Sequence, residues 1–174
     1  VISADAADNY EPDPVFGLDP RLTDRAANTA IMAMYAENLF WDGRAEPEFI
    51  DPETGETIIT SGGALESQAV GPVVSDVEMA HAGLDWADVT SKLERAVPMA
   101  LATDLPPDMA DALIAQPGYP DLFEDAFGSA DISAARIGMA IATYERTLLP
   151  DQTPWDAFIQ GNQNAMTPQQ RQGW

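Results

Sequence analysis

Proline and glycine interrupt this chain so often that it can form only short elements. Among 174 residues there are 14 prolines and 12 glycines, and helices usually end at or before the residue that precedes a proline. After Gly62-Gly63 the spacing of these residues predicts a series of short helices. We expect them over residues 64–70, 85–96, 106–115, 120–127, 132–149 and 155–159, with two more beginning at Ser75 and Thr167.

Two helices are predicted from the periodicity of their apolar residues. Segment 132–149 carries apolar side chains at helical spacing, which predicts a core-facing helix capped by Asp131 or Ser129. This stripe consists of Ile132, Ile137, Ala140, Ile141, Tyr144 and Leu148. Residues 23–37 show a similar spacing, so we predict a further amphipathic helix there.

The first third of the chain contains the only β-signal. Residues 51–55 (DPETG) have turn chemistry and lie between Phe49-Ile50 and Ile58-Ile59, which predicts a short β-hairpin. Residues 1–20 combine acids with three prolines and little periodicity, so we expect an extended N-terminal arm. The predicted fold class is mainly α, and 45% hydrophobic residues suffice for one substantial core.

Charge and residue usage exclude several functions. The chain has 8 basic and 29 acidic residues, a formal net charge of −21, which repels nucleic acid and anionic membrane surfaces. No segment approaches the roughly 18 apolar residues of a membrane span. Cysteine is absent, so the chain has no disulfide, thiolate site or haem attachment of its own. The single histidine, His81, is interpreted as a surface or hydrogen-bonded residue rather than an iron ligand.

Four short stretches carry a more specific signal. They read LFWDGRA at 39–45, LESQAVGP at 65–72 followed by VEM at 77–79, YPDLF at 119–123 with AFG at 126–128, and IATYERTL at 141–148 with PWD at 154–156. In this order the stretches resemble the bacterial di-haem cytochrome c peroxidases and their MauG-type relatives. The resemblance extends over about residues 20–174.

The resemblance implies an incomplete cytochrome c-like di-haem peroxidase fold. In that family this stretch lies between two haems c, each attached through a Cys-x-x-Cys-His motif that is absent here. We therefore expect residues 21–150 to be the remainder of the first, peroxidatic haem domain and 151–174 to lead into the second. Segment 46–63 is interpreted as a hairpin insertion. A natural haem-free relative is the alternative to a fragment.

The resemblance also assigns the candidate site residues. Trp41 resembles the tryptophan between the two haems that helps an electron cross; otherwise it is a buried indole beside an Asp42–Arg44 salt bridge. Glu78 and Gln68 resemble the pair that moves a proton and orients peroxide, although Ser75-x-x-Glu78 is also a capping box. Pro72 would shape that pocket.

The function implied is reduction of hydrogen peroxide, with electrons from a small cytochrome c or a cupredoxin, in the periplasm. Radical oxidation of a protein substrate, as by MauG, is an alternative, and so is a haem-free acidic helical interaction module. We expect this chain alone to be inactive. The sequence leaves open whether the protein forms a homodimer. The family binds calcium partly through an asparagine, but Asn28 is displaced from that position, so no metal is expected.

Overall fold

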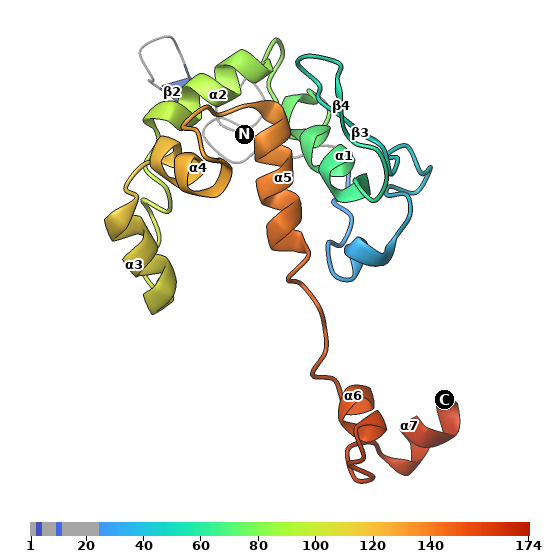
Figure 1. Ribbon diagram of the computed structural model, residues 1–174. Helices are drawn as coiled ribbons and strands as arrows, with labels where there is room; N and C mark the ends of the chain where they lie inside the picture. The colour runs from blue at the N-terminus through green and yellow to red at the C-terminus, as the bar shows by residue number, and fades with distance from the viewer. Residues whose placement is uncertain (1–2, 5–9, 12–24) are drawn as a thin grey trace.

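The computed structural model describes residues 3–4, 10–11 and 25–174. Most of the predicted arm over residues 1–20 lies outside this part, as does the predicted helix start at Thr23. Two short strands, β1 (Ser3–Ala4) and β2 (Tyr10–Glu11), pair antiparallel within the arm. The remainder is mainly helical (Figure 1), which confirms the predicted fold class. No helix in the described part is long and apolar enough to cross a membrane.

The predicted hairpin is present and contributes one residue, Phe49, to the core. Strands β3 (Phe49–Ile50) and β4 (Thr57–Ile59) pair antiparallel. In the turn between them, the buried carboxylate of Asp51 accepts hydrogen bonds from the Glu53 amide and the Thr54 hydroxyl. The Phe49 side chain is fully buried. The hairpin is therefore held in place by a buried phenylalanine and by hydrogen bonds within its own turn.

Helices α1 (Ala64–Val70) and α5 (Ala134–Glu145) form the central pair. The buried face of α5 consists of Ala134, Ala135, Ile137, Gly138 and Ala142. This differs from the predicted stripe, because Ile141 is 36% and Tyr144 is 64% exposed. The buried face of α5 carries mostly small side chains, which let the backbones of α1 and α5 approach closely. The face of α5 that is packed is therefore not its most hydrophobic face.

A consequence of this close packing is that Gly138 should not tolerate a methyl group. A Cβ built there would lie 2.8 Å from Cγ1 of Val70, and overpacking of this kind costs about 1–3 kcal/mol. Alanine regains roughly 1 kcal/mol through helix propensity, so Gly138→Ala should destabilise the protein by about 1 kcal/mol net. Urea unfolding measures this change. Gly173→Ala is the matched control, since a Cβ there meets nothing within 4 Å, and it should leave stability unchanged or slightly raised.

The hairpin also determines where α5 begins. The carboxylate of Glu53 accepts a hydrogen bond of 2.7 Å from the Ala134 amide, and the Ser133 hydroxyl accepts one from the Arg136 amide. Ser133 is thus the N-cap, in place of the predicted Asp131 or Ser129. Because a carboxylate satisfies an otherwise orphan donor at the helix N-terminus, segment 46–63 contributes to the stability of α5.

A second layer packs on the N-terminal part of α5. Trp86 of α2 (Trp86–Arg95) and Phe123 of α4 (Tyr119–Phe127) are buried in one cluster with Ile137. Helix α2 begins with a capping box between Asp85 and Asp88. Helix α3 (Pro107–Ala115) follows α2 and projects from the rest of the fold (Figure 1).

The predicted helix over residues 23–37 is wrong for the described residues. From Arg25 onward the only helical element of that segment is the 3-10 turn η1 (Ala33–Tyr35). Met32 has a positive φ of 64°, and its amide donates to the Leu148 carbonyl at 3.3 Å. A bond to a distant segment has replaced the local helical bond, and sequence periodicity cannot anticipate such a replacement.

The predicted helix from Ser75 is also absent. A 3-10 turn, η2 (Pro72–Val74), follows α1, and residues 76–79 form turns. The Ala80 amide donates to the Ser75 carbonyl, and the Met79 amide donates to the Pro72 carbonyl. The segment thus folds back on η2.

Helices α6 (Pro154–Ile159) and α7 (Pro168–Gly173) lie away from the other elements (Figure 1). Thr153 and Thr167 are their N-caps, and the rings of Trp155 and Trp174 pack 4.5 Å apart. A domain boundary near Pro150 stays a prediction.

Candidate functional site

The main candidate site is an open cavity of about 550 Å³ beside the loop that carries Trp41. Three of the four predicted site residues, Trp41, Pro72 and Glu78, line it. Its other lining residues are Arg25, Ala26, Ala27, Asn28, Phe40, Arg44 and Met79. Pro72 and Glu78 follow Trp41 by 31 and 37 positions in the sequence, yet all three line one cavity. They meet because the turns after η2 fold back toward the Trp41 loop.

A short backbone bridge fixes the Trp41 loop. The Leu39 amide donates to the Ala45 carbonyl at 3.0 Å, and the reverse bond is 3.3 Å. Phe40 and Gly43 adopt positive φ angles of 64° and 71°, which allow the sharp reversal between them. At the tip of this loop Trp41 is 88% exposed, so the alternative of a buried indole is wrong. An exposed tryptophan at a cavity is typical of a binding surface.

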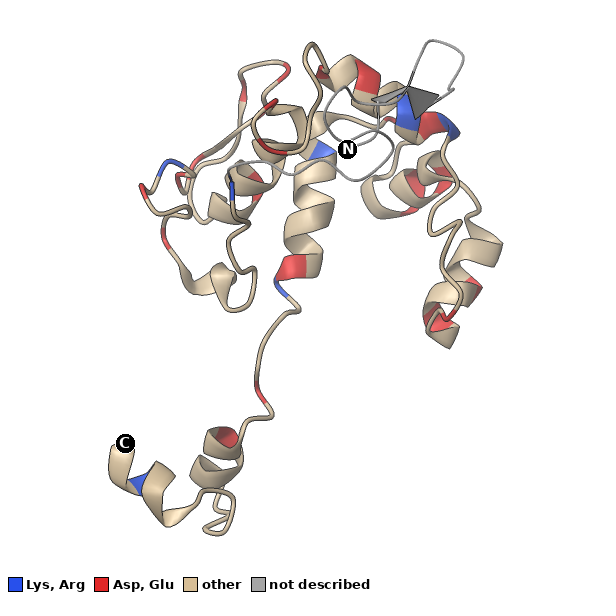
Figure 2. Ribbon diagram, turned by 180° about the vertical axis from the view of Figure 1, so that it is seen from behind, with Lys and Arg blue, Asp and Glu red and all other residues tan. Residues whose placement is uncertain are grey.

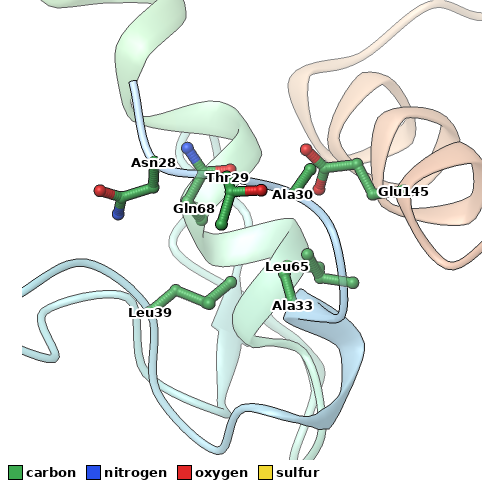
Figure 3. A pocket seen from close by; sticks show the side chains of 8 residues that line it. All are labelled: Asn28, Thr29, Ala30, Ala33, Leu39, Leu65, Gln68 and Glu145. Carbon is green, nitrogen blue, oxygen red and sulfur yellow. The ribbon is translucent and has the colours of Figure 1, made fainter. Parts of the chain in front are cut away.

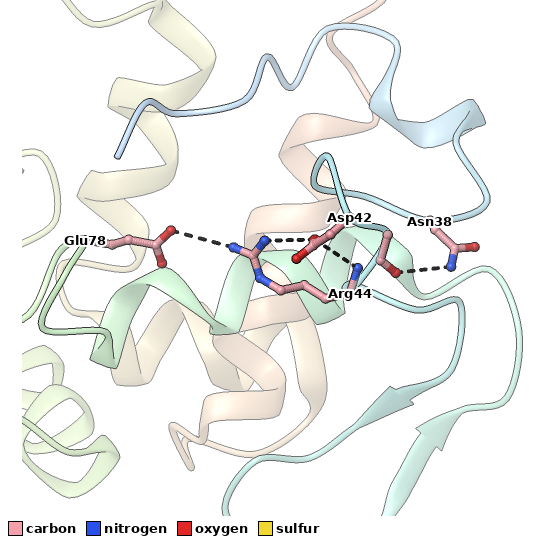
Figure 4. Close-up of polar contacts among 5 residues, drawn as sticks. Asn38, Asp42, Arg44 and Glu78 are labelled. Carbon is pink, nitrogen blue, oxygen red and sulfur yellow. Dashed lines mark hydrogen bonds and ion pairs between the residues drawn. The ribbon is translucent and has the colours of Figure 1, made fainter. Parts of the chain in front are cut away.

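Arg44 links the loop to Glu78. Its guanidinium lies 2.9 Å from Asp42 and 3.9 Å from the Glu78 carboxylate (Figure 4), and it stacks 3.6 Å from the centre of the Phe40 ring. Desolvation acts to raise the pKa of Asp42, but the hydrogen bonds and charge of Arg44 outweigh it and lower that pKa overall. The predicted Asp42–Arg44 salt bridge is present, and it positions a cation between two carboxylates.

Glu78 is held by a turn and not by a helix cap. Its amide donates to the Ser75 carbonyl at 3.1 Å, while its side chain is 19% exposed and directed toward Arg44 (Figure 4). The capping-box alternative is therefore wrong, since no helix begins at Ser75. A partly buried carboxylate beside a guanidinium group can accept and release a proton.

The fourth predicted residue, Gln68, does not line this cavity. It lines a separate pocket of about 20 Å³ together with Asn28 and Glu145 (Figure 3), which is room for a single water molecule. Gln68 lies on α1 about one turn before Pro72, which lines the larger cavity. The structure thus separates the predicted Gln68–Glu78 pair.

Glu145 is a polar group that the sequence analysis missed. Its Oε2 atom is buried and has no hydrogen-bond partner among the described residues. Burial raises the pKa of this carboxyl, the charge of Arg146 acts to lower it, and the charge of Glu66 raises it further. The sequence shows only one glutamate at the end of an amphipathic helix, so no local signal marks it.

Glu145→Gln should therefore raise stability at neutral pH. A carboxyl whose pKa is raised in the folded protein destabilises it above that pKa, and the penalty disappears as the pH falls below the ordinary carboxyl value. We expect the variant to melt at a higher temperature than the wild type near pH 7 and at the same temperature near pH 3. Thermal unfolding at a series of pH values tests this, and a pH-independent difference would contradict it.

Among the described residues, neither His81 nor a cluster of possible metal ligands forms a second site. The His81 ring nitrogen Nδ1 lies 3.0 Å from the Ala82 carbonyl oxygen, and His81 is not among the residues of the Trp41 cavity. Within the described residues, no three histidine, aspartate or glutamate side chains gather as metal ligands would.

Comparison with known proteins identifies a consistent set of relatives. The family model described as di-haem cytochrome c peroxidase matches residues 4–164. The methylamine utilization protein MauG of Methylophilus methylotrophus is 28% identical over 150 residues, which cover 86% of this chain and 33% of that protein. The cytochrome c peroxidase of Escherichia coli K12 is 28% identical over 148 residues, or 85% of this chain and 23% of that protein. The cytochrome c551 peroxidase of Nitrosomonas europaea is 26% identical over 136 residues, which cover 78% of this chain and 28% of that protein. The chain thus spans 23–33% of the length of these relatives.

Proposed function

The chain belongs to the di-haem cytochrome c peroxidase family, and from this premise we propose that it contributes the peroxide-side pocket of a two-haem oxidoreductase. The observation that carries the proposal is that Trp41, Pro72 and Glu78 line one cavity. The net reaction takes hydrogen peroxide, two protons and two electrons to two water molecules. Because the chain spans only part of its relatives, the proposal concerns the whole protein.

The cavity has the properties that a haem requires. Phe40, Trp41, Pro72 and Met79 give it an apolar and aromatic wall. Arg25 and Arg44 also line it, in a chain with only 8 basic residues, and guanidinium groups pair well with carboxylates such as haem propionates. When bound, haem would supply the electrons that cleave the O–O bond. Since the chain lacks cysteine, it cannot hold that haem covalently.

Each of the predicted site residues has its own role in the proposed reaction. The Glu78 carboxylate takes a proton from one peroxide oxygen and returns it to the other, which becomes water. Arg44 keeps that carboxylate directed toward the cavity through the 3.9 Å contact. Pro72 shapes the wall, and the Trp41 indole helps an electron cross from the second haem to the first. Gln68 is retained as the amide that orients peroxide, which would require it to turn from its present pocket.

The wider assignments follow from the same family. We propose residues 21–150 as part of the first haem domain and 151–174 as the lead-in to the second, with a periplasmic location. A small cytochrome c or a cupredoxin is the proposed electron donor. The similarity to MauG favours one alternative, oxidation of a protein substrate at the same cavity.

The first test is expression of the whole protein with c-type haem maturation. Two haems per chain by pyridine haemochrome, together with peroxide-dependent oxidation of a reduced small cytochrome c, would support the proposal. A mass equal to bare polypeptide would overturn it and leave the acidic interaction module. Peroxide turnover without oxidation of the cytochrome would exclude that donor, and oxidation of a protein substrate would favour the MauG-like alternative.

Trp41→Phe tests the proposed electron path within that protein. We expect slower donor oxidation at unchanged haem content, because phenylalanine keeps the apolar contact but is far harder to oxidise than indole. Stopped-flow oxidation of the reduced donor measures the rate. Trp174→Phe is the matched control, since Trp174 is also exposed, at 79%, and lies outside the cavity. Equal rates in the two variants would remove Trp41 from the path.

A further inference from the structure

The small pocket between α1 and α5 contains a polar atom that the described residues do not satisfy. Gln68 of α1 and Glu145 of α5 both line this pocket, whose volume is about 20 Å³. The Oε2 atom of Glu145 is buried and has no hydrogen-bond partner among the described residues. Buried polar atoms in folded proteins are almost always hydrogen-bonded, either to protein or to ordered water. We therefore asked what the pocket could bind.

The charges around Glu145 exclude an anion from this pocket. Arg146 is the next residue, but its guanidinium is already bound to both oxygens of Glu66, at 2.7 and 3.0 Å. The described residues that line the pocket include no lysine, arginine or histidine. Burial raises the pKa of the Glu145 carboxyl, the charge of Arg146 acts to lower it, and the charge of Glu66 raises it further. This carboxyl group therefore tends to keep its proton and can donate it to a neutral acceptor.

The lining of the pocket suits a water molecule and not a metal ion. Four of the lining side chains carry oxygen atoms: Asn28, Thr29, Gln68 and Glu145. The remaining four are apolar: Ala30, Ala33, Leu39 and Leu65. A calcium ion takes roughly six to eight oxygen ligands, whereas a buried water molecule needs only about two to four polar partners. The volume of the pocket also corresponds to one water molecule.

We propose that this pocket binds one water molecule that joins Glu145 to Gln68 and so holds the Gln68 amide away from the Trp41 cavity. In Figure 3 the side chains of these two residues lie on either side of Thr29. The water accepts a hydrogen bond from the Glu145 carboxyl group and donates one to the Gln68 amide oxygen. The Thr29 hydroxyl accepts from the Ile31 amide at 3.2 Å, and its own O–H can donate to the same water.

The water site makes Glu145 a positioning residue that acts through Gln68. This step rests on the proposed function, in which Gln68 orients peroxide after turning into the Trp41 cavity. Gln68 must then give up its bond to the water before it can contact peroxide. A ligand that requires a less populated conformation binds more weakly, in proportion to the population of that conformation. The water site should therefore weaken the apparent affinity for peroxide.

A crystal structure of the whole protein near pH 7 tests the water site directly. We expect one ordered water within hydrogen-bond distance of the Glu145 carboxyl group and the Gln68 amide. Glu145→Gln should retain this water, because its amide can still donate, whereas Glu145→Leu should lose it. A wild-type pocket without water, or a direct bond between Glu145 and Gln68, would overturn the proposal. This result does not depend on peroxide turnover, so it decides the water site even if the proposed function fails.

Peroxide kinetics of the haem-loaded protein test the positioning role. Glu145→Leu should lower the KM for peroxide about two- to tenfold at an unchanged kcat, which is the effect of releasing one net hydrogen bond. Glu145→Gln should keep the wild-type KM. Glu94→Leu, on the exposed surface of α2, controls for the loss of one carboxylate and should also keep it. A wild-type KM in Glu145→Leu, or an equal change in Glu145→Gln, would refute the positioning role.

Discussion

Replacing Glu78 with glutamine should lower peroxide turnover of the haem-loaded protein by about 10²- to 10⁴-fold, the usual contribution of a general acid–base group. Glutamine keeps the size and polarity of the side chain but cannot accept a proton and return it. The loss should appear in kcat/KM for peroxide, because proton movement accompanies O–O cleavage. The initial rate of donor oxidation at a series of peroxide concentrations measures it.

Structural explanations for that loss can be separated from the proton role. Glu78 contacts Arg44 at 3.9 Å, so the variant also removes an ion pair, but one between partly exposed side chains contributes at most about 1 kcal/mol. Haem content and melting temperature should therefore stay near wild type. Glu94→Gln on the exposed surface of α2 is the matched control and should retain full activity. Turnover within twofold of wild type in Glu78→Gln would reject the assignment.

Local sequence determined much of the helical framework. Helix α1 begins and ends where predicted, because Gly62-Gly63 precede it and Gly71-Pro72 end it. Helices α2, α3, α4 and α6 agree with the predicted ranges within two residues, for the same reason. Their boundaries depend on backbone restrictions of proline and glycine and on capping side chains, which act over three or four residues and are visible in sequence.

Contacts between distant segments account for what sequence could not predict. The Met32 amide bonds the Leu148 carbonyl, which excludes the predicted helix over residues 23–37. The Glu53 carboxylate at the start of α5 comes from a hairpin 81 residues earlier. At the site, the resemblance placed Gln68, Pro72 and Glu78 at one pocket and Trp41 between the haems. In the structure Trp41, Pro72 and Glu78 line one cavity, whereas Gln68 faces the small pocket beside Glu145.

The largest stability effect should come from the ion pair between Arg146 and Glu66, which no local motif revealed. Both Glu66 oxygens accept from the guanidinium, at 2.7 and 3.0 Å, and these hydrogen bonds raise the pKa of Arg146 despite its partial burial. The Glu66 side chain is 4% exposed, whereas that of Arg146 is 34% exposed. If the ion pair is removed, water can therefore solvate the Arg146 side chain but not the Glu66 carboxylate.

This asymmetry predicts unequal losses for the two single variants. Arg146→Met should lower the free energy of unfolding by about 3–5 kcal/mol, because it leaves the Glu66 carboxylate buried and unpaired. Glu66→Leu should cost less, since the Arg146 head group can turn to solvent. The double variant should be closer to wild type than Arg146→Met, because a buried ion pair replaced by apolar residues of similar volume is often neutral. Urea unfolding of all four proteins gives the cycle. Additive losses would show that the α1–α5 contact depends on packing, and not on the charge pair.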